Sequence, residues 1–243
     1  MTRYLVTLEY KGTLFRGFQR QPGFPTVQGA LESAVLTYSG EEVRVLGAGR
    51  TDAGVHAIGQ TAAFDLSEKV DIERARGGLN ALLARGISIT GMKEVPSDFD
   101  PRRDALRREY RYFILNRPTP SPLLEETAYH FPGELDRELM RQVCSLFEGE
   151  HDFSAFRAGK EEKSTLRTVS RCEMSEPCPE LLCFIVRASS FLYKMVRIMG
   201  SAALAAGSGK MGLSELESHL EGGAGPCAEP LPAHGLFLWE VTY

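Results

Sequence analysis

Apolar and polar residues alternate along much of residues 1–95, and this period of two predicts β-strands. The strands are expected at 3–10, 43–46, 58–66 and 87–95. Two stretches between them place apolar residues at helical spacing, one after Thr26 and one after Asp71, and both residues are favourable helix N-caps. The predicted order βαββαβ is that of a ferredoxin-like unit.

The remaining residues repeat this order of elements without repeating the sequence. Strands are expected at 106–115, 166–174, 181–188 and 236–242, and helices at 135–147, 191–206 and 214–220. We therefore predict an α+β fold of two ferredoxin-like domains, residues 1–104 and 105–243. Edge strands are expected to join the halves into one extended antiparallel sheet, with helices on one face and a cleft on the other.

Composition narrows the class of protein only slightly. The chain has 243 residues and a net charge of −4, which excludes a globally basic nucleic-acid-binding protein but not a local basic face. No apolar run is long enough to span a membrane and the N-terminus lacks a signal-peptide pattern, so we expect a cytoplasmic protein. Five cysteines without CxxC spacing predict reduced thiols, and five scattered histidines predict no metal site.

Residues 101–120 form a local basic stretch. They contain six arginines against Asp104 and Glu109, a balance of 6 − 2 = +4. Aromatic residues interleave with the arginines, as they do in grooves that bind RNA. A solvated protein surface has a similar charge pattern, so composition leaves both interpretations open.

The segment 47–60, GAGRTDAGVHAIGQ, lies between two predicted strands. Its glycines permit tight turns, but it has neither the Gly-Lys-Ser/Thr of a phosphate-binding loop nor GxGxxG before a helix. The segment presents Arg50, Thr51 and Asp52 at the end of a strand. An aspartate in a glycine-rich loop is more often a turn or capping residue than a catalytic one.

This segment resembles the signature of the tRNA pseudouridine synthase A family, GRTDAGVHA followed by GQ. Five further segments resemble motifs of that family: 9–21 (EYDGxxFxGWQxQ), 98–112 (FxARxxAxxRxYRY), 151–157 (HDFSxFR), 191–197 (FLxxMVR) and 233–238 (AxGLxL). Three positions depart from the pattern, because Lys11 replaces an aspartate, Phe18 a tryptophan, and Glu109 a residue that is often basic. None of the three removes a proposed catalytic group.

The resemblance implies a function and a set of site residues. Asp52 matches the catalytic aspartate, Tyr110 the substrate-contacting tyrosine, Arg197 an active-site arginine and Arg50 an RNA-contacting arginine. The implied reaction converts uridine to pseudouridine at positions 38, 39 and 40 in the anticodon arm of tRNA. The resemblance also implies a homodimer, no cofactor, and a catalytic role for the expected cleft.

The implied chemistry requires an ionised carboxylate in a dry pocket. Such a group can attack C1′ of the ribose, stabilise positive charge there, or add to C6 of the base, and the sequence does not choose among these routes. We expect Arg197 to lie near Asp52 and keep it charged. The target base must leave its stack, so Tyr110 is expected to stack on the extruded uracil, while Arg50 fills the vacated space or holds the RNA backbone.

Other interpretations compete with these. Tyr110 can be an ordinary half-buried strand residue, and Arg197 can form a structural ion pair. His56 is expected to support the residues around the site or to bond backbone, rather than transfer protons. His151-Asp152 is expected to form a cap and turn after the 135–147 helix. For the whole protein, the rival functions are a non-catalytic RNA-binding module and an N-glycosylase that breaks the same glycosidic bond.

Overall fold

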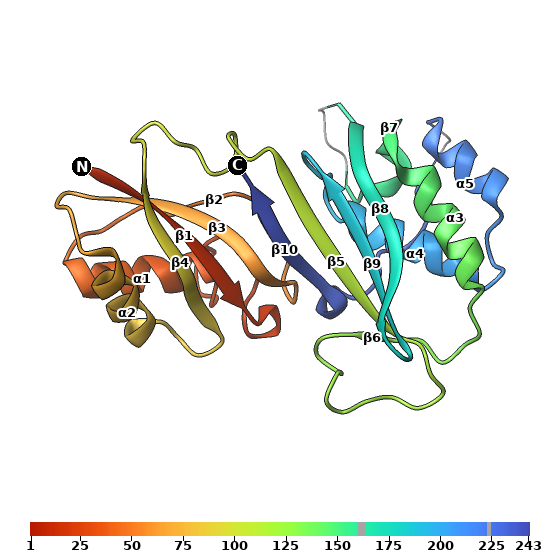
Figure 1. Cartoon of the computed structure of the whole chain (residues 1–243), viewed down its shortest axis with the longest axis horizontal. Coiled ribbons are helices and arrows are strands. Elements are labelled where there is room, and N and C mark those ends of the chain that lie inside the picture. Colours follow the sequence, from red (N-terminus) through yellow and green to blue (C-terminus); the bar gives the residue numbers. More distant parts are fainter. Residues whose placement is uncertain (160–163, 223–224) are drawn as a thin grey trace. The chain divides into compact units, whose positions relative to one another are not determined.

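The computed structural model describes residues 1–159, 164–222 and 225–243, which form two compact units (Figure 1). Unit 1 contains Met1–Leu106 and Phe237–Tyr243, and unit 2 contains Arg107–Leu236. The first boundary falls close to the expected one at 104/105. The last strand differs from the expected division, because all of its residues except Leu236 belong to unit 1.

Unit 1 has the expected βαββαβ order. Its elements are β1 (Thr2–Tyr10), a 3-10 turn (Gly12–Leu14), α1 (Val27–Ser39), β2 (Leu46–Gly47), β3 (His56–Leu66), α2 (Ile72–Leu82), β4 (Ile87–Val95) and, from the end of the chain, β10 (Leu236–Thr242). β1 lies between β3 and β4 and is antiparallel to both. The second predicted strand is much shorter than expected and lies later, at Leu46–Gly47.

The outer edge of β3 is shared by two strands. β2 pairs with it in antiparallel fashion at Ala62 and Ala63, whereas β10 pairs with it in parallel at His56 and Ala57. The expectation of an antiparallel sheet is therefore wrong at this edge, and the sheet is mixed. The parallel pairing requires the end of the chain to return to the start of β3, which local sequence patterns do not encode.

The two helices of unit 1 begin where their capping residues predict. The Thr26 hydroxyl accepts a hydrogen bond from Gly29 N at 3.2 Å, and the Asp71 carboxylate accepts one from Arg74 N at 2.8 Å. The buried face of α1 consists of Val27, Leu31, Ala34 and Val35. In α2, Ala75 and Leu79 are buried, whereas Leu82 at the end of the helix is 43% exposed.

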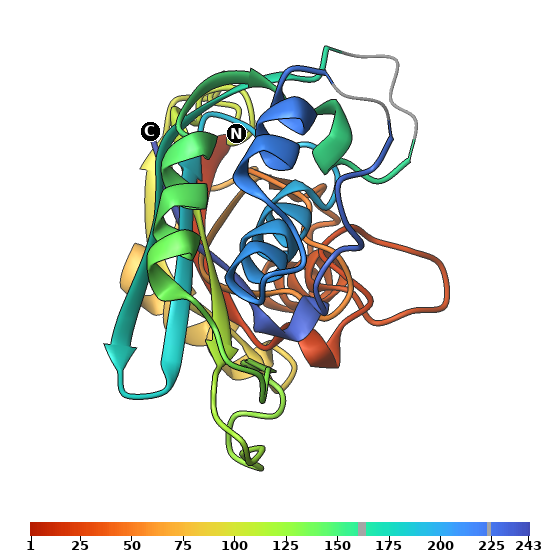
Figure 2. The same cartoon turned by 90° about the vertical axis from the view of Figure 1, so that its right-hand side faces the viewer.

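Unit 2 has the elements β5 (Arg107–Leu115), β6 (Tyr129–His130), α3 (Arg137–Phe147), β7 (Gly149–Asp152), a 3-10 turn (Phe153–Phe156), β8 (Leu166–Cys178), β9 (Leu181–Ala188), α4 (Met195–Gly207), α5 (Leu213–Leu220) and a last 3-10 turn (Ala233–Gly235). The strands follow the order β5-β9-β8-β7, and β6 runs parallel to β5. Helices α3, α4 and α5 lie on one face of this sheet (Figure 2). The short strands β6 and β7 were not predicted.

Two local predictions in unit 2 need correction. The helix expected from 191 begins at Met195, because Lys194 adopts a left-handed backbone with φ 61° that no α-helix accommodates. Asp152 does act as a cap, but it ends β7 and accepts from Ser154 N at 2.9 Å in the following 3-10 turn. Within the described ranges, no helix has the length and apolar composition of a membrane span.

Candidate active site

The loop between β2 and β3 carries Asp52 in unit 1. The Asp52 carbonyl accepts a hydrogen bond from Val55 N at 3.1 Å, which closes a tight turn. Gly54, the third residue of this turn, has φ +84°, a conformation that glycine adopts without steric cost. The turn holds the half-buried side chain of Asp52 just before β3 begins.

Thr51 is held at both its side chain and its main chain. Its hydroxyl lies 2.8 Å from the phenol oxygen of Tyr10, and its carbonyl accepts from Phe18 N at 3.0 Å. Gly17 permits this approach, because its φ is +93° and a Cβ there would lie 2.9 Å from the Thr51 carbonyl oxygen. The residue before Asp52 is therefore fixed from two directions, which limits where the carboxylate can lie.

Gly12 and His56 hold the other side of the turn. A Cβ on Gly12 would lie 1.9 Å from the carbonyl oxygen of Val55, so only glycine fits there. Gly12 N donates to His56 Nδ1 at 3.2 Å, and the His56 ring stacks on Phe237 with centroids 4.6 Å apart. The prediction that His56 bonds backbone is confirmed, because Nδ1 accepts from an amide.

Gln60 anchors the start of the loop, and the sequence analysis did not assign it a role. Its side chain is fully buried, and Nε2 donates to Gly49 O at 3.0 Å and to the Tyr10 phenol at 3.5 Å. Burial raises the pKa of Tyr10 to about 12, against hydrogen bonds with Thr51 and Gln60 that lower it, so the phenol stays neutral near pH 7. Arg50, beside Gly49, is exposed.

Tyr110 lies on β5 in unit 2 and is half-buried, as the structural interpretation expected. Its ring meets Phe191 edge to face, with centroids 5.1 Å apart and an interplanar angle of 88°. Phe191 occupies this position in the segment that precedes α4, where the helix was wrongly expected. The contact with Phe191 therefore restricts the orientation of the Tyr110 ring.

Arg197 lies in the first turn of α4 and holds a strap formed by residues 231–235. Its Nε donates to Leu231 O at 2.6 Å, and Leu231 N donates back to Arg197 O at 3.2 Å. The Tyr112 phenol donates to Pro232 O at 2.8 Å, and burial raises the pKa of Tyr112 far above its usual value. Sequence reasoning missed Tyr112, although it is the second tyrosine of the Tyr-Arg-Tyr motif.

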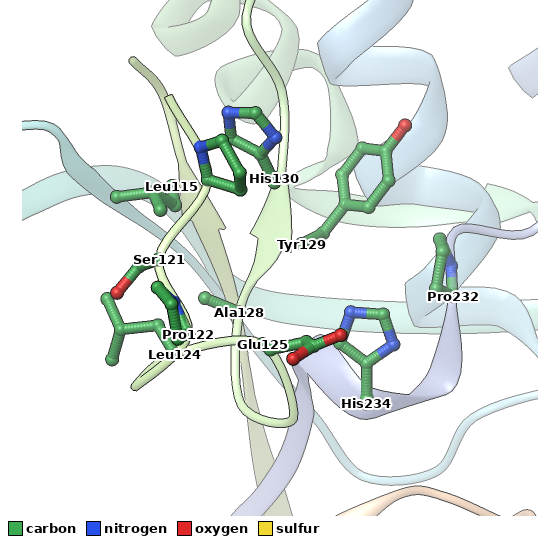
Figure 3. Close-up of a pocket in the computed structure, with 11 residues that line it drawn as sticks. Leu115, Ser121, Pro122, Leu124, Glu125, Ala128, Tyr129, His130, Pro232 and His234 are labelled. Carbon is green, nitrogen blue, oxygen red and sulfur yellow. The ribbon is translucent and has the colours of Figure 1, made fainter. Parts of the chain in front are cut away.

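A pocket of about 380 Å³ adjoins this strap (Figure 3). Its walls include Tyr129 and His130 from β6, and Pro232 and His234 from the strap itself. His130 Nε2 lies 2.8 Å from Arg117 O, which ties its ring to the loop after β5. The phenol and imidazole rings and the prolines of this pocket lie beside the strap that Arg197 holds. No lysine or arginine is among the described residues that line the pocket.

The basic stretch 101–120 does not form a uniform basic surface. Glu109 is 2% exposed and pairs with Arg111 at 2.8 Å, with Arg187, and with Arg171 at 4.0 Å. Burial acts to raise the pKa of Glu109, but hydrogen bonds from Arg111 and Arg187 outweigh burial and lower it. Glu109 therefore neutralises part of the arginine charge, so the arginines do not act as one continuous basic surface.

The structure places Arg50 and Asp52 on one loop of unit 1. Tyr110 and Arg197 both lie in unit 2, where Tyr110 contacts Phe191 and Arg197 lies further along the chain in the first turn of α4. The proximity of Arg197 to Asp52 stays a prediction.

A βαββαβ unit that presents an aspartate on a GRTDAGVHA loop indicates a pseudouridine synthase, which is an isomerase. The family model described as tRNA pseudouridine synthase matches residues 7–103 and 143–243. The chain belongs to this family. The tRNA pseudouridine synthase A of Methylorubrum extorquens is 42% identical over 249 residues, and that of Caldicellulosiruptor bescii 37% identical over 245 residues. Both alignments cover 100% of each chain.

Proposed function

We propose that this chain converts uridine to pseudouridine at positions 38, 39 and 40 in the anticodon arm of tRNA, with Asp52 as the catalytic carboxylate. The observation that carries the proposal is similarity to tRNA pseudouridine synthases A over the full length of the chain. The hydrogen bonds around Thr51 support a catalytic Asp52 rather than a simple turn residue, because a turn alone does not require its neighbour to be held from two directions.

The reaction is an isomerisation, so its atoms balance without a co-reactant. The N1–C1′ bond breaks, the uracil rotates, and C5 bonds to C1′. N1 gains a proton and C5 loses one. Asp52 acts either on C1′, as a nucleophile or as a counter-charge, or on C6 as a nucleophile. No cofactor takes part in any of these routes.

The other site residues position the substrate. Tyr110 stacks on the extruded uracil, and the edge-to-face contact with Phe191 fixes the plane of its ring. Arg197 is the active-site arginine of this proposal, and its bond to the Leu231 carbonyl fixes the guanidinium plane. Arg50, exposed two residues before Asp52, holds the RNA backbone or the space that the flipped base leaves.

The active form is a homodimer in the cytoplasm. The assembly follows from the family resemblance, and an extended RNA arm suits a groove lined by two copies. All five cysteines are free thiols and four are buried, which suits a reducing compartment. Light scattering of the purified chain gives the molar mass, and a monomer under conditions of full activity contradicts the dimer.

The direct test is incubation with unmodified tRNA followed by mapping of pseudouridine. The wild-type chain is expected to modify positions 38–40 without changing the mass of the RNA. Asp52→Ala is expected to abolish product while RNA binding persists. Release of free uracil supports the N-glycosylase instead, and an Asp52→Asn chain with unchanged cellular function supports a non-catalytic RNA-binding module.

A further inference from the structure

The segment 16–25 of unit 1 forms a loop that reaches into solvent between the first 3-10 turn and α1. Every residue from 19 to 25 is exposed. Phe24 near its tip is 55% exposed, which is unusual for a large apolar ring. Gly17 and Phe18 contact the Asp52 loop. These contacts do not explain Phe24 and Arg16.

The exposure of Phe24 does not come from a loose chain. Arg16 N donates to Pro25 O at 2.8 Å, and Gln28 N donates to Phe18 O at 2.9 Å, so the two ends of the loop are bonded to each other. The Gln21 side chain donates to Arg16 O at 2.9 Å inside the loop. A closed loop that holds an aromatic ring in water keeps apolar surface available for a partner.

The charge of this region indicates the kind of partner. Residues 11–31 contain Lys11, Arg16 and Arg20 and no acidic residue, and of these Arg20 pairs with Glu32 at 3.3 Å. The Arg16 guanidinium lies 6.0 Å from the centroid of the Phe24 ring. Among the described residues Arg16 forms no ion pair with a carboxylate. An exposed aromatic ring beside a cation is the combination that binds a nucleobase and its phosphate.

The loop is also physically linked to the catalytic loop. Phe18 N donates to the carbonyl of Thr51, the residue before Asp52. Arg16 precedes Phe18 by two residues, so at most about 7 Å of extended chain separates them. Arg16 and Phe24 are therefore placed to contact RNA within a few nucleotides of the one that reacts.

We propose that Phe24 and Arg16 bind an unpaired nucleotide of the RNA next to the reacting uridine. The base stacks on the Phe24 ring, and the Arg16 guanidinium binds the adjoining phosphate. Stacking does not depend on the hydrogen-bonding groups of the base, so the same contact can be made with different bases. An enzyme that modifies three adjacent positions requires such tolerance. This inference rests on the proposed function and adds a substrate contact to it.

The test measures pseudouridine formation on unmodified tRNA by Phe24 and Arg16 variants. Phe24→Ala is expected to raise KM roughly tenfold with little change in kcat, the loss typical of one base–aromatic stack. Phe24→Trp is expected to restore KM, because it keeps a stacking surface. Arg16→Ala is expected to lower the salt slope of binding, log Kobs against log[salt], by about one.

Matched controls separate this role from general surface effects. Leu36→Ala removes an apolar side chain from the surface of α1 in the same unit, and it is 41% exposed. Arg74→Ala removes an exposed arginine from α2. Both variants are expected to keep the wild-type KM and the wild-type salt slope.

Three outcomes decide the matter. If wild-type protein forms pseudouridine and Phe24→Ala keeps the wild-type KM, the Phe24 contact is wrong while the proposed function stands. If Phe24→Ala instead converts a dimer to a monomer, Phe24 packs between copies and the RNA contact is again wrong. If wild-type protein forms no pseudouridine on any tRNA, the proposed function fails first, and this inference falls with it.

Discussion

The phenol of Tyr10 and the hydroxyl of Thr51 lie 2.8 Å apart, both buried, directly beneath the turn that carries Asp52. Tyr10 ends β1 and Thr51 precedes Asp52, the proposed catalytic residue, by one position, so the hydrogen bond joins the first strand to the loop that carries Asp52. The position of the carboxylate therefore depends on a residue that is 41 positions from Thr51 in the sequence. A catalytic group needs such support, because small displacements are costly for reaction rate.

Tyr10→Phe tests this support. The variant keeps the ring but leaves the Thr51 hydroxyl without its phenol partner, so it should lose about 1 kcal/mol of unfolding free energy. We expect kcat to fall about tenfold, because Asp52 becomes less well positioned. Urea unfolding and pseudouridine kinetics measure the two effects.

Tyr4→Phe is the matched control. Tyr4 is also a buried tyrosine of β1, and its phenol accepts from Val70 N at 2.9 Å, far in sequence from the Asp52 loop. A similar loss of stability with wild-type kcat is expected. If both variants lose equal activity, Tyr10 does not act through Thr51.

The stability of the protein should fall in alkaline solution partly because of Tyr10. Its pKa is about 12 in the folded chain and about 10 when the chain is unfolded, so folding favours the neutral phenol. The stabilisation is complete below pH 10 and is lost as the pH rises through 12. Urea unfolding between pH 9 and 11.5 should show a shallower loss for Tyr10→Phe than for wild type, and parallel curves contradict the assignment.

Gly12→Ala should disrupt the other side of the catalytic turn. The added Cβ would lie 1.9 Å from the Val55 carbonyl oxygen, which is backbone and cannot rotate away. We expect a loss of about 1–3 kcal/mol in stability together with most of the activity. Gly77→Ala, on α2 with open space around its Cβ, should instead stabilise by about 0.5–1 kcal/mol. Full activity in Gly12→Ala shows that the turn can shift without harm.

Arg197→Lys should impair catalysis although it keeps the charge. Lysine has no Nε that can donate to the Leu231 carbonyl while a planar fork faces the active site. We expect kcat to fall about 10- to 100-fold. Arg141→Lys, in an exposed pair with Glu138 on α3, is the control and should leave kcat unchanged. Equal kcat for wild type and Arg197→Lys rules out a specific role for the guanidinium.

Glu109→Gln should destabilise unit 2, because it leaves the surrounding arginines without their buried counter-charge. Breaking a buried ion pair costs about 3 kcal/mol, whereas Glu138→Gln removes an exposed pair and should cost less than about 0.5 kcal/mol. Folding lowers the pKa of Glu109, so its ionised carboxylate stabilises the folded chain at pH values above its unfolded pKa. This stabilisation is lost as the pH falls through the pKa of the folded state. Chemical unfolding at pH 7 and pH 3 checks both statements.

Local patterns predicted much of the fold. The strand β4 begins and ends at the expected residues, and Thr26 and Asp71 cap their helices, because alternation and capping involve residues close in the chain. The start of α4 was placed four residues early. The left-handed conformation of Lys194, a residue type that rarely adopts it, has no local signal.

For the candidate site as well, the sequence indicated the local motif but not the long-range contacts. The motif around Asp52 was sufficient to indicate the family, which the comparisons show, whereas the catalytic role of Asp52 stays a prediction. The motif did not indicate that Tyr10, Gly12 and Gln60 hold the loop, because each contact joins residues that are far apart in the sequence.

The sequence alone was enough for the type and order of the longer helices and strands, though not for the short strands β6 and β7, since the longer elements follow from side-chain periodicity and caps within a few positions. Three features required the folded chain: the parallel pairing of β10 with β3, the ion pair of Glu109 with Arg187, and the hydrogen bond between Tyr10 and Thr51. Each brings together groups separated by tens of residues or more. Their free energy arises from burial and hydrogen bonding that exist only after the chain has packed.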